Sequence, residues 1–406
     1  MKRTITLFEM FSGIGSSYLA LKNVYKYTTC DVLSLGSCDF YIDAIISYMI
    51  IHYGVLEPEE NLSKQEMVDI LNQYSFSANA KDVVKPNYFK RLNINKLKAI
   101  FVYLYSYVNP TYFKFKYPNV KYPHLTNHTD ITTFSKLPKD IDILTYSFPC
   151  QDLSQQGKQK GLGESTRSGL LYQIERILKS NQDRLPKILL LENVKGLVSK
   201  KFINDFNKWI ETLDKLGYSS KYAILNATDY GSSQNRERVF MLSILKTENK
   251  DITFPPTKSS FKSTNLEDII NNPYANNNLE HLLKYKHTDF KTTSFNITKA
   301  KLINYSNFNS ESYIYKPINK GATLTASGAN SRLKFYFQQE NIIRYINEIE
   351  AYLYMGFSEN DVLKIKSTNL ITPTKMIFCA GNSICIQVLE AIFKEIKNYF
   401  IKDELS

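Results

Sequence analysis

The sequence predicts an α/β protein with a doubly wound, mostly parallel sheet and a second, smaller and irregular domain. Short apolar runs of strand length alternate with segments of helical periodicity, as in βαβ units. A glycine turn follows the first of these runs. After about residue 245 the buried-strand pattern gives way to Pro, Ser, Thr and Asn, which marks the second domain.

The first element is a strand over Thr4–Phe8. The turn Phe11–Gly15 breaks it, and helical character resumes at Tyr18–Leu21. This is the shape of a nucleotide-binding βα unit, although the third glycine of the dinucleotide fingerprint is missing and a lone GxG is weak evidence. Asp39 lies about where such units carry an acid that accepts hydrogen bonds from ribose hydroxyls. Together these features predict an adenosyl ligand.

A Lys- and Tyr-rich insert covers about residues 51–125. Its second half, from Lys85 to Lys121, holds eight Lys or Arg residues and no acid. Such a segment could clamp phosphates while its tyrosines stack. A solvated helical face explains the same composition at least as well.

The next strand, over 141–147, leads into Pro149-Cys150-Gln151. Ligands of open α/β sheets bind outside the carboxyl ends of the strands. A thiolate there can add to an electron-poor carbon, so Cys150 is a candidate nucleophile. A lone cysteine is more often a small buried hydrophobe, and that alternative stays open on this evidence.

The polar stretch 154–163 has the composition of a loop over a site. Helical periodicity follows at Leu170, Leu171, Ile174, Ile177 and Leu178. A buried strand over 187–191 then delivers Glu192-Asn193-Val194 at its end, and a further strand covers 238–244.

The boundaries that follow are a first domain over 1–245, a second over 246–345, a hinge over 346–375 and a C-terminal segment over 376–406 that returns to the first domain. The last segment carries an amphipathic helix after Gly381-Asn382-Ser383.

Composition narrows the class of protein. The chain of 406 residues has a formal charge of +12 and a pI near 9.1, which favours a polyanionic partner, nucleic acid first. A basic proteome from an AT-rich genome would look the same. The five cysteines show no CxxC pair, so neither a disulfide framework nor a metal site is indicated. We expect a cytoplasmic protein without a signal peptide or membrane span.

Several motifs in one order resemble those of the DNA cytosine-5 methyltransferases. The motifs are Phe11–Gly15, Pro149–Gln151, Glu192–Val194, Gln234–Arg238, Arg344 with Glu350, Met355 and Gly356, and Gly381–Ser383. They span nearly the whole chain. Residues 147–154 and 323–332 resemble the bacterial members that modify CG dinucleotides. The fold implied is the Rossmann-like class I methyltransferase fold, with 246–345 as target-recognition domain.

The resemblance implies a catalytic set. Cys150 would add to C6 of cytosine, which makes C5 nucleophilic. Glu192 would stabilise a proton at N3, and this requires a carboxyl group that holds a proton near neutrality. Arg238 would donate to the cytosine O2, and Arg236 would hold the catalytic loop or the nucleophile's strand. The alternative for Glu192 is a strand-end carboxylate that caps a helix. The alternative for Arg236 and Arg238 is a surface pair on an edge strand.

The implied cofactor is S-adenosylmethionine, with S-adenosylhomocysteine as product and no metal. Phe11 would stack near the adenine, and Gly13 and Gly15 would let the backbone approach the methionine moiety. The remaining cofactor contacts would come from Asp39, Phe40, Asp130, Ile131, Pro149 and Asn382. The family usually has Glu where this chain has Asp39, and a shorter arm would weaken the ribose contact.

The implied substrate is double-stranded DNA, from which the base must be flipped out. Gln151 or Gln156 would fill the vacated space, and Lys158 and Lys160 would grip phosphates. The segment 323–332 is the predicted recognition segment; its predicted contact residues are Thr323, Ser327, Gly328, Asn330 and Arg332. The segment 344–350 departs from the family pattern and is expected to support the recognition domain. We expect a monomer. The sequence leaves open whether a cognate restriction endonuclease, without direct binding, accompanies the enzyme.

Three other kinds of protein share part of this pattern. Amino-methyltransferases carry a different motif where this chain has Pro149-Cys150. A tRNA cytosine-5 methyltransferase would have a smaller variable region. A non-catalytic DNA-binding relative would not need Cys150, Glu192 and Arg238.

Overall fold

The computed structural model describes residues 3–120, 127–148, 167–251, 253–257 and 263–401. They form two compact units. The first holds the chain up to 225, 237–255 and the segment from 389 onward; the second holds 226–236 and 256–388. The boundaries differ from those expected from the sequence, because 226–236 joins the second unit and the return begins at 389 instead of 376.

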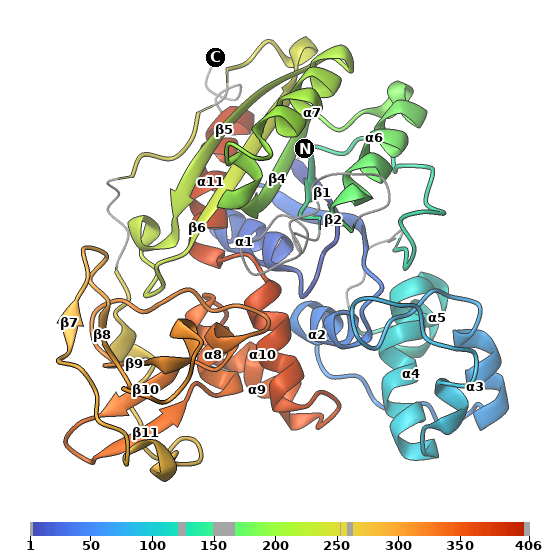
Figure 1. The fold of residues 1–406 in the computed structure, drawn as a ribbon. Coiled ribbons are helices and arrows are strands. Elements are labelled where there is room, and N and C mark those ends of the chain that lie inside the picture. The colour runs from blue at the N-terminus through green and yellow to red at the C-terminus, as the bar shows by residue number, and fades with distance from the viewer. Residues whose placement is uncertain (1–2, 121–126, 149–166, 252, 258–262, 402–406) are drawn as a thin grey trace. The chain divides into compact units, whose positions relative to one another are not determined.

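A six-stranded sheet in the order β2-β1-β3-β4-β6-β5 forms the centre of the first unit (Figure 1). Its strands are β1 (Thr4–Met10), β2 (Asp31–Cys38), β3 (Ile143–Tyr146), β4 (Ile188–Val194), β5 (Tyr218–Asn226) and β6 (Glu237–Leu245). β1 pairs in parallel with β2 and β3, and β3 with β4, whereas β6 runs antiparallel to β4. The predicted doubly wound, mostly parallel sheet is confirmed.

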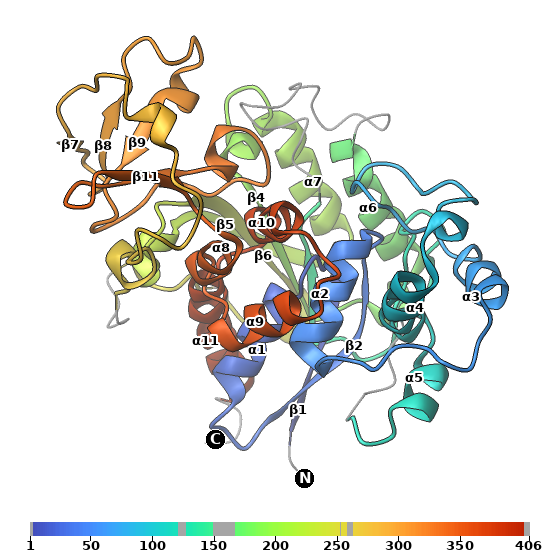
Figure 2. The same ribbon diagram turned by 90° about the horizontal axis from the view of Figure 1, so that it is seen from below.

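Helices cover both faces of this sheet. They are α1 (Ser16–Tyr25), α2 (Ile42–Tyr53), α6 (Leu171–Ser180), α7 (Ile203–Lys215) and α11 (Ile386–Ile401). Figure 2 shows α6 and α7 on one face and α1, α2 and α11 on the other. β3 and β4 are buried on both faces, and β4 accordingly begins with a continuous apolar run over 188–191 instead of an alternating pattern.

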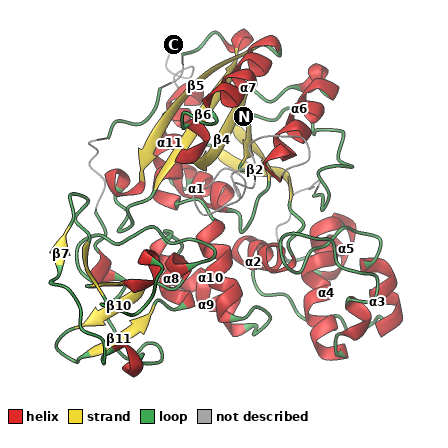
Figure 3. Ribbon diagram, viewed as in Figure 1, coloured by secondary structure: helices red, strands yellow, loops and turns green. Residues whose placement is uncertain are grey.

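The predicted insert folds as helices α3 (Lys64–Leu71), α4 (Ile94–Val108) and α5 (Pro110–Lys116), which are labelled in Figure 3. Ser63 and Glu66 form a capping box at the start of α3. Lys85, Lys90 and Arg91 are exposed. The basic residues of the insert are therefore largely solvated, and both explanations of their charge remain predictions.

The second unit contains a small sheet in the order β11-β10-β9-β8-β7. Its strands are β7 (Lys291–Thr292), β8 (Thr298–Lys301), β9 (Tyr313–Tyr315), β10 (Lys334–Phe337) and β11 (Ile342–Tyr345), and its helices are α8 (Glu348–Tyr354), α9 (Glu359–Ser367) and α10 (Pro373–Asn382). Arg344 on β11 is fully buried, and its guanidinium donates to both carboxylate oxygens of Glu350, at 2.9 and 2.7 Å. This bidentate pair joins the sheet to α8 within the unit.

In the described part of the chain, Pro373–Phe400 is one stretch of the length and apolarity of a membrane span. It consists of α10 and α11 with a break at residues 383–385, and 67% of its most apolar window is buried. Core helices of globular proteins have the same properties.

Candidate active site

Candidate site residues of the first unit gather at one edge of the sheet. β1, β2, β3 and β4 are parallel, so their carboxyl ends meet there. The strand order reverses direction between β1 and β3, which is the switch point where open α/β sheets bind ligands. The turn 11–15 follows β1, Asp39 follows β2, and Phe148 follows β3. Glu192 lies near the carboxyl end of β4.

The turn 11–15 has an unusual backbone. Phe11, Gly13 and Gly15 all have positive φ, at 58, 55 and 79°. For a phenylalanine this is a strained conformation of the kind that clusters at ligand sites. Among the described residues, no atom lies within 4 Å of a Cβ built on Gly13, so there is open space at this point. That space fits a closely approaching ligand, as predicted for Gly13.

Gly15 needs to be a glycine for a different reason. A Cβ at this position would lie 2.1 Å from Nε2 of His52 and 2.8 Å from the ring of Tyr48. Gly15 thus packs closely against two side chains of α2. The sequence predicts only a cofactor contact for Gly15, so this packing was missed.

Asp39 is held at the end of β2 by backbone donors. Its carboxylate accepts hydrogen bonds from the amides of Gly13 at 2.7 Å and Tyr41 at 2.9 Å. Desolvation raises the pKa of Asp39, opposed by the hydrogen bonds from the Tyr41, Gly13 and Phe40 amides. A carboxylate has about four acceptor positions, so this one retains capacity for a diol. The residue fits the predicted ribose contact.

The segment that carries Asp130 extends the edge beside β2. His128 forms a parallel bridge with Cys38, and its carbonyl accepts from the Asp39 amide at 3.1 Å. Asp130 accepts from both the amide and the hydroxyl of Thr132, at 2.8 and 2.6 Å. The structure therefore brings Asp130, and with it Ile131, to the same edge as Asp39 and Phe40.

Glu192 and Arg238 form an ion pair across the antiparallel β4–β6 ladder. Nε of Arg238 lies 3.3 Å from Oε1 of Glu192, and both side chains are mostly buried, with 16 and 11% of their surface exposed. The ladder pairs Val194 with Arg238, which brings the arginine beside the end of β4. Sequence analysis named both residues, and the structure brings them together.

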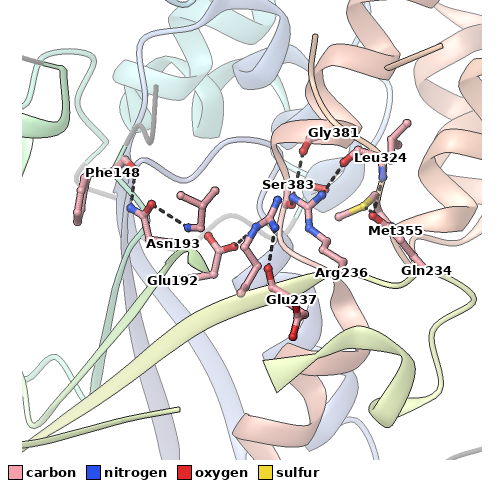
Figure 4. A network of polar contacts seen from close by, with 12 residues as sticks. Phe148, Glu192, Asn193, Gln234, Arg236, Glu237, Leu324, Met355, Gly381 and Ser383 are labelled. Carbon is pink, nitrogen blue, oxygen red and sulfur yellow. Dashed lines mark hydrogen bonds and ion pairs between the residues drawn. The ribbon is translucent and has the colours of Figure 1, made fainter. Parts of the chain in front are cut away.

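Asn193 ties the end of β4 to the end of β3. Its side-chain amide donates to the Phe148 carbonyl at 3.1 Å, a buried contact visible in Figure 4. Phe148 precedes Cys150 by two positions in the sequence. Asn193 had been noted only as part of a motif, and its anchoring role was missed.

Part of the predicted site lies outside the described residues. This holds for the nucleophile and the loop after it, namely Pro149, Cys150, Gln151, Gln156, Lys158 and Lys160.

In the second unit, Arg236 binds three backbone carbonyls from two segments. Its buried guanidinium donates to the carbonyls of Leu324 at 2.6 Å, Gly381 at 3.1 Å and Ser383 at 3.0 Å (Figure 4). These contacts hold the recognition segment to the end of α10. Sequence analysis predicts that Arg236 holds the catalytic loop or the nucleophile's strand. That loop lies outside the described residues, so this role stays a prediction beside the three carbonyl contacts.

The recognition segment 323–332 is anchored at its start. The Thr323 hydroxyl donates to the Asn235 carbonyl at 2.6 Å, and the Leu324 amide donates to Oε1 of the fully buried Gln234 at 2.9 Å. A Cβ on Gly381 would lie 2.5 Å from the backbone of Thr325 and Ala326. Gly381 is therefore required for close packing against this segment, and Gln234 is an anchor that sequence reasoning did not single out.

The rest of the segment turns outward. Ser327, Gly328 and Arg332 are exposed, and the Asn330 carbonyl accepts from the Thr325 amide at 3.2 Å. Arg332 also pairs with Glu311 at 3.1 Å. Asn382, at the last position of α10, is exposed. The predicted DNA-contact residues of this segment thus lie on one anchored loop.

The chain is similar to known proteins over most of its length. The family model "C-5 cytosine-specific DNA methylase" matches residues 108–398. The orphan methyltransferase M.SssI of Spiroplasma monobiae is 41% identical over 401 residues, 97% of each chain. The type II methyltransferase M2.ScrFI of Lactococcus lactis subsp. cremoris is 31% identical over 97% of this chain and 99% of its own.

Solved structures agree with the fold. The Entamoeba histolytica methyltransferase EhMeth and the S. pombe methyltransferase Dnmt2 each align with a TM-score of 0.54, at 14 and 16% identity over 99% of both chains. The family match and the relatives together confirm the predicted enzyme class, and the chain belongs to the C-5 cytosine-specific DNA methyltransferases.

Proposed function

We propose that this enzyme transfers a methyl group from S-adenosylmethionine to C5 of a flipped cytosine in duplex DNA, in a CG context, through a covalent adduct between Cys150 and C6. We further propose that it acts in the cytoplasm as a monomer. The observation that carries the proposal is the pairing of Glu192 with Arg238 at the strand end that Asn193 joins to Phe148, two residues before Cys150.

Each residue would make a separate contribution. The Cys150 thiolate forms the S–C6 bond, and the electron pair displaced from the C5–C6 double bond makes C5 nucleophilic. Glu192 stabilises the proton at N3 as charge builds on the ring, and Arg238, already beside Glu192, offers guanidinium donors to O2. After C5 has accepted the methyl group that S-adenosylmethionine would supply, leaving S-adenosylhomocysteine, loss of the C5 proton to solvent and cleavage of the S–C6 bond would restore the C5–C6 double bond, regenerate the Cys150 thiolate and release the base.

The cofactor-binding edge supports the same proposal. The open space at Gly13 and the remaining acceptor capacity of Asp39 fit an adenosyl ligand, with Phe11, Phe40, Asp130 and Ile131 beside them. When bound, S-adenosylmethionine supplies an electrophilic methyl group on its sulfonium. The residues of the turn and of the β2 end would bind and orient it.

The CG context rests on two segments. Residues 147–154 and 323–332 resemble the corresponding segments of CG-modifying enzymes, and the second forms an anchored loop with exposed Ser327 and Arg332. The relatives are named an orphan and a type II methyltransferase, which supports a role in DNA modification, with or without a partner nuclease.

Transfer of tritiated methyl to plasmid DNA, followed by bisulfite sequencing, tests target atom and context together. We expect 5-methylcytosine in CG and no transfer by Cys150→Ala. Normal methylation by that variant would refute the adduct, and a mark on an exocyclic nitrogen would refute the reaction. Duplexes with 5-fluorocytosine should give a complex that survives a denaturing gel.

Glu192→Gln tests the proposed role of the carboxyl group. Methyl transfer should fall far more than DNA binding, because the variant cannot stabilise the N3 proton. Glu237→Gln is the matched control, since Glu237 pairs with Lys195 at the surface. Equal losses of transfer and DNA binding in Glu192→Gln would contradict the assigned role.

A further inference from the structure

A group of buried and half-buried polar side chains lies behind the turn 11–15. We call Glu9, Tyr18, Lys22, Tyr48 and His52 the turn-support cluster. Glu9 belongs to β1, Tyr18 and Lys22 to α1, and Tyr48 and His52 to α2. None of these residues belongs to a motif of the sequence analysis, and the proposed chemistry uses none of them.

His52 contacts the turn directly. Its Nε2 lies 3.2 Å from the Gly15 carbonyl oxygen, and its Nδ1 lies 3.0 Å from Nζ of Lys22. An ammonium group only donates, so Nδ1 is the acceptor and Nε2 carries the proton that is donated to Gly15. Burial and the positive charge of Lys22 lower the pKa of His52 well below its usual value, which keeps the imidazole in this neutral form.

The Gly15 carbonyl has a second partner. It accepts the Leu19 amide at 3.0 Å, the first hydrogen bond of α1, while the Gly15 amide closes the turn on the Ser12 carbonyl at 2.9 Å. Gly15 is the N-cap residue of α1 and has no side chain that could cap the helix. His52 thus fixes the orientation of the peptide group that joins the turn to the helix, and the peptide of Gly13 lies within that turn.

The imidazole is itself held in place. Its centroid lies 4.5 Å from the ring of Tyr48 and 4.8 Å from that of Tyr18, and Nζ of Lys22 lies 4.5 Å above the Tyr18 ring. Glu9 accepts from the Tyr18 amide and the Tyr48 hydroxyl, both at 3.2 Å. The cluster therefore links β1, α1 and α2 behind the turn.

We propose that His52 and Lys22 are positioning residues for the cofactor: together they hold the Gly15 carbonyl and thereby the turn that would bind an adenosyl ligand. The inference rests on the proposed use of S-adenosylmethionine. It predicts that cofactor affinity depends on His52, a side chain of α2 that contacts Gly15 of the turn.

Two substitutions of His52 separate positioning from bulk. His52→Gln keeps an N–H donor at the same number of bonds from Cα and an acceptor for Lys22. His52→Leu keeps only the volume of the side chain. Ile46→Ala is the control, because Ile46 is also buried but lies on another face of α2. It is separated from Tyr48 by about 160° and from His52 by about 120° around the helix axis. The full-length proteins are compared by calorimetric binding of S-adenosylhomocysteine, by DNA binding and by amide hydrogen exchange.

His52→Leu should weaken S-adenosylhomocysteine about tenfold, the usual consequence of losing a buried hydrogen bond, with faster exchange at the Gly15 and Leu19 amides and unchanged DNA binding. His52→Gln should stay within about threefold of the parent. The inference is wrong if His52→Leu binds the ligand as the parent does, if Gln fails to rescue, or if Ile46→Ala weakens binding equally.

Failure of the proposed function has a different signature. In that case the parent protein itself binds no S-adenosylhomocysteine, whatever the exchange rates of the turn.

Discussion

Nε of Arg238 on β6 lies 3.3 Å from Oε1 of Glu192 on β4. These two strands are antiparallel, whereas β1 to β4 run parallel to one another. Both side chains are mostly buried, so each charge helps to compensate the other. Because the pair joins the two strand ends that the proposed chemistry uses, it contributes to stability and would also orient the catalytic groups.

Replacement of Arg238 by Met should lower the free energy of unfolding by roughly 3 kcal/mol, because the mostly buried Glu192 carboxylate loses this cationic partner. Urea unfolding measures this. The surface pair Lys195–Glu237, at 3.1 Å, is the control: Lys195→Met should change stability by less than about 1 kcal/mol. Similar losses in the two variants would mean that burial of the first pair contributes little.

Asn193→Ala removes the buried hydrogen bond that the Asn193 side chain donates to the Phe148 carbonyl. We expect a loss of roughly 1–3 kcal/mol in unfolding free energy. Methyl transfer should fall more than DNA binding, because the strand before Cys150 loses its anchor. A variant with parental stability and parental turnover would remove Asn193 from the site.

Gly13→Ala and Gly15→Ala should differ although both residues have positive φ. At Gly13 the cost is only that of the left-handed conformation, about 1–2 kcal/mol. At Gly15 the new Cβ also overlaps His52, which adds about 1–3 kcal/mol of overpacking. Thermal or urea unfolding without ligand should rank Gly15→Ala as the less stable variant. The reverse ranking would contradict the packing at Gly15.

Gly381→Ala should displace the recognition segment, because its Cβ would lie 2.5 Å from the backbone of Thr325 and Ala326. We expect reduced discrimination between CG and non-CG duplexes in competition binding, and a stability loss of roughly 1–3 kcal/mol. Thr374→Ala, at an exposed position of the same helix, should leave both properties unchanged. Unchanged discrimination in Gly381→Ala would show that the packing of Gly381 against Thr325 and Ala326 does not contribute to DNA sequence recognition.

Glu9 should make stability depend on pH. Desolvation by burial raises its pKa from 4.5 to about 8, against the hydrogen bonds of Tyr18 and Tyr48 and the charge of Lys22. Its folded pKa exceeds the unfolded value, so its contribution is complete below pH 4.5 and is lost as the pH rises toward 8, by up to about 1.4 kcal/mol per unit.

Glu9→Gln removes this titration and should flatten the decline of Tm between pH 5 and pH 8. Parallel curves for parent and variant would show that Glu9 ionises in the folded protein as it does in the unfolded chain.

The apolar runs of the sequence determined the strands β1, β3, β4 and β6 to within a few residues, because strands buried in a sheet must be apolar. Ordered motifs identified the family, and with it Glu192 and Arg238, because the side chains needed for this chemistry recur at recognisable positions. The distance of Asp39 from the glycine turn predicts a ribose contact for this residue.

Only the tertiary structure decided which of these residues meet. The antiparallel direction of β6 sets the Glu192–Arg238 contact, and the membership of 226–236 in the second unit gives Arg236 its carbonyl partners. His52 supports Gly15 from 37 positions away along the chain. Such contacts depend on the packing of elements distant in sequence, and local periodicity and composition carry no record of that packing.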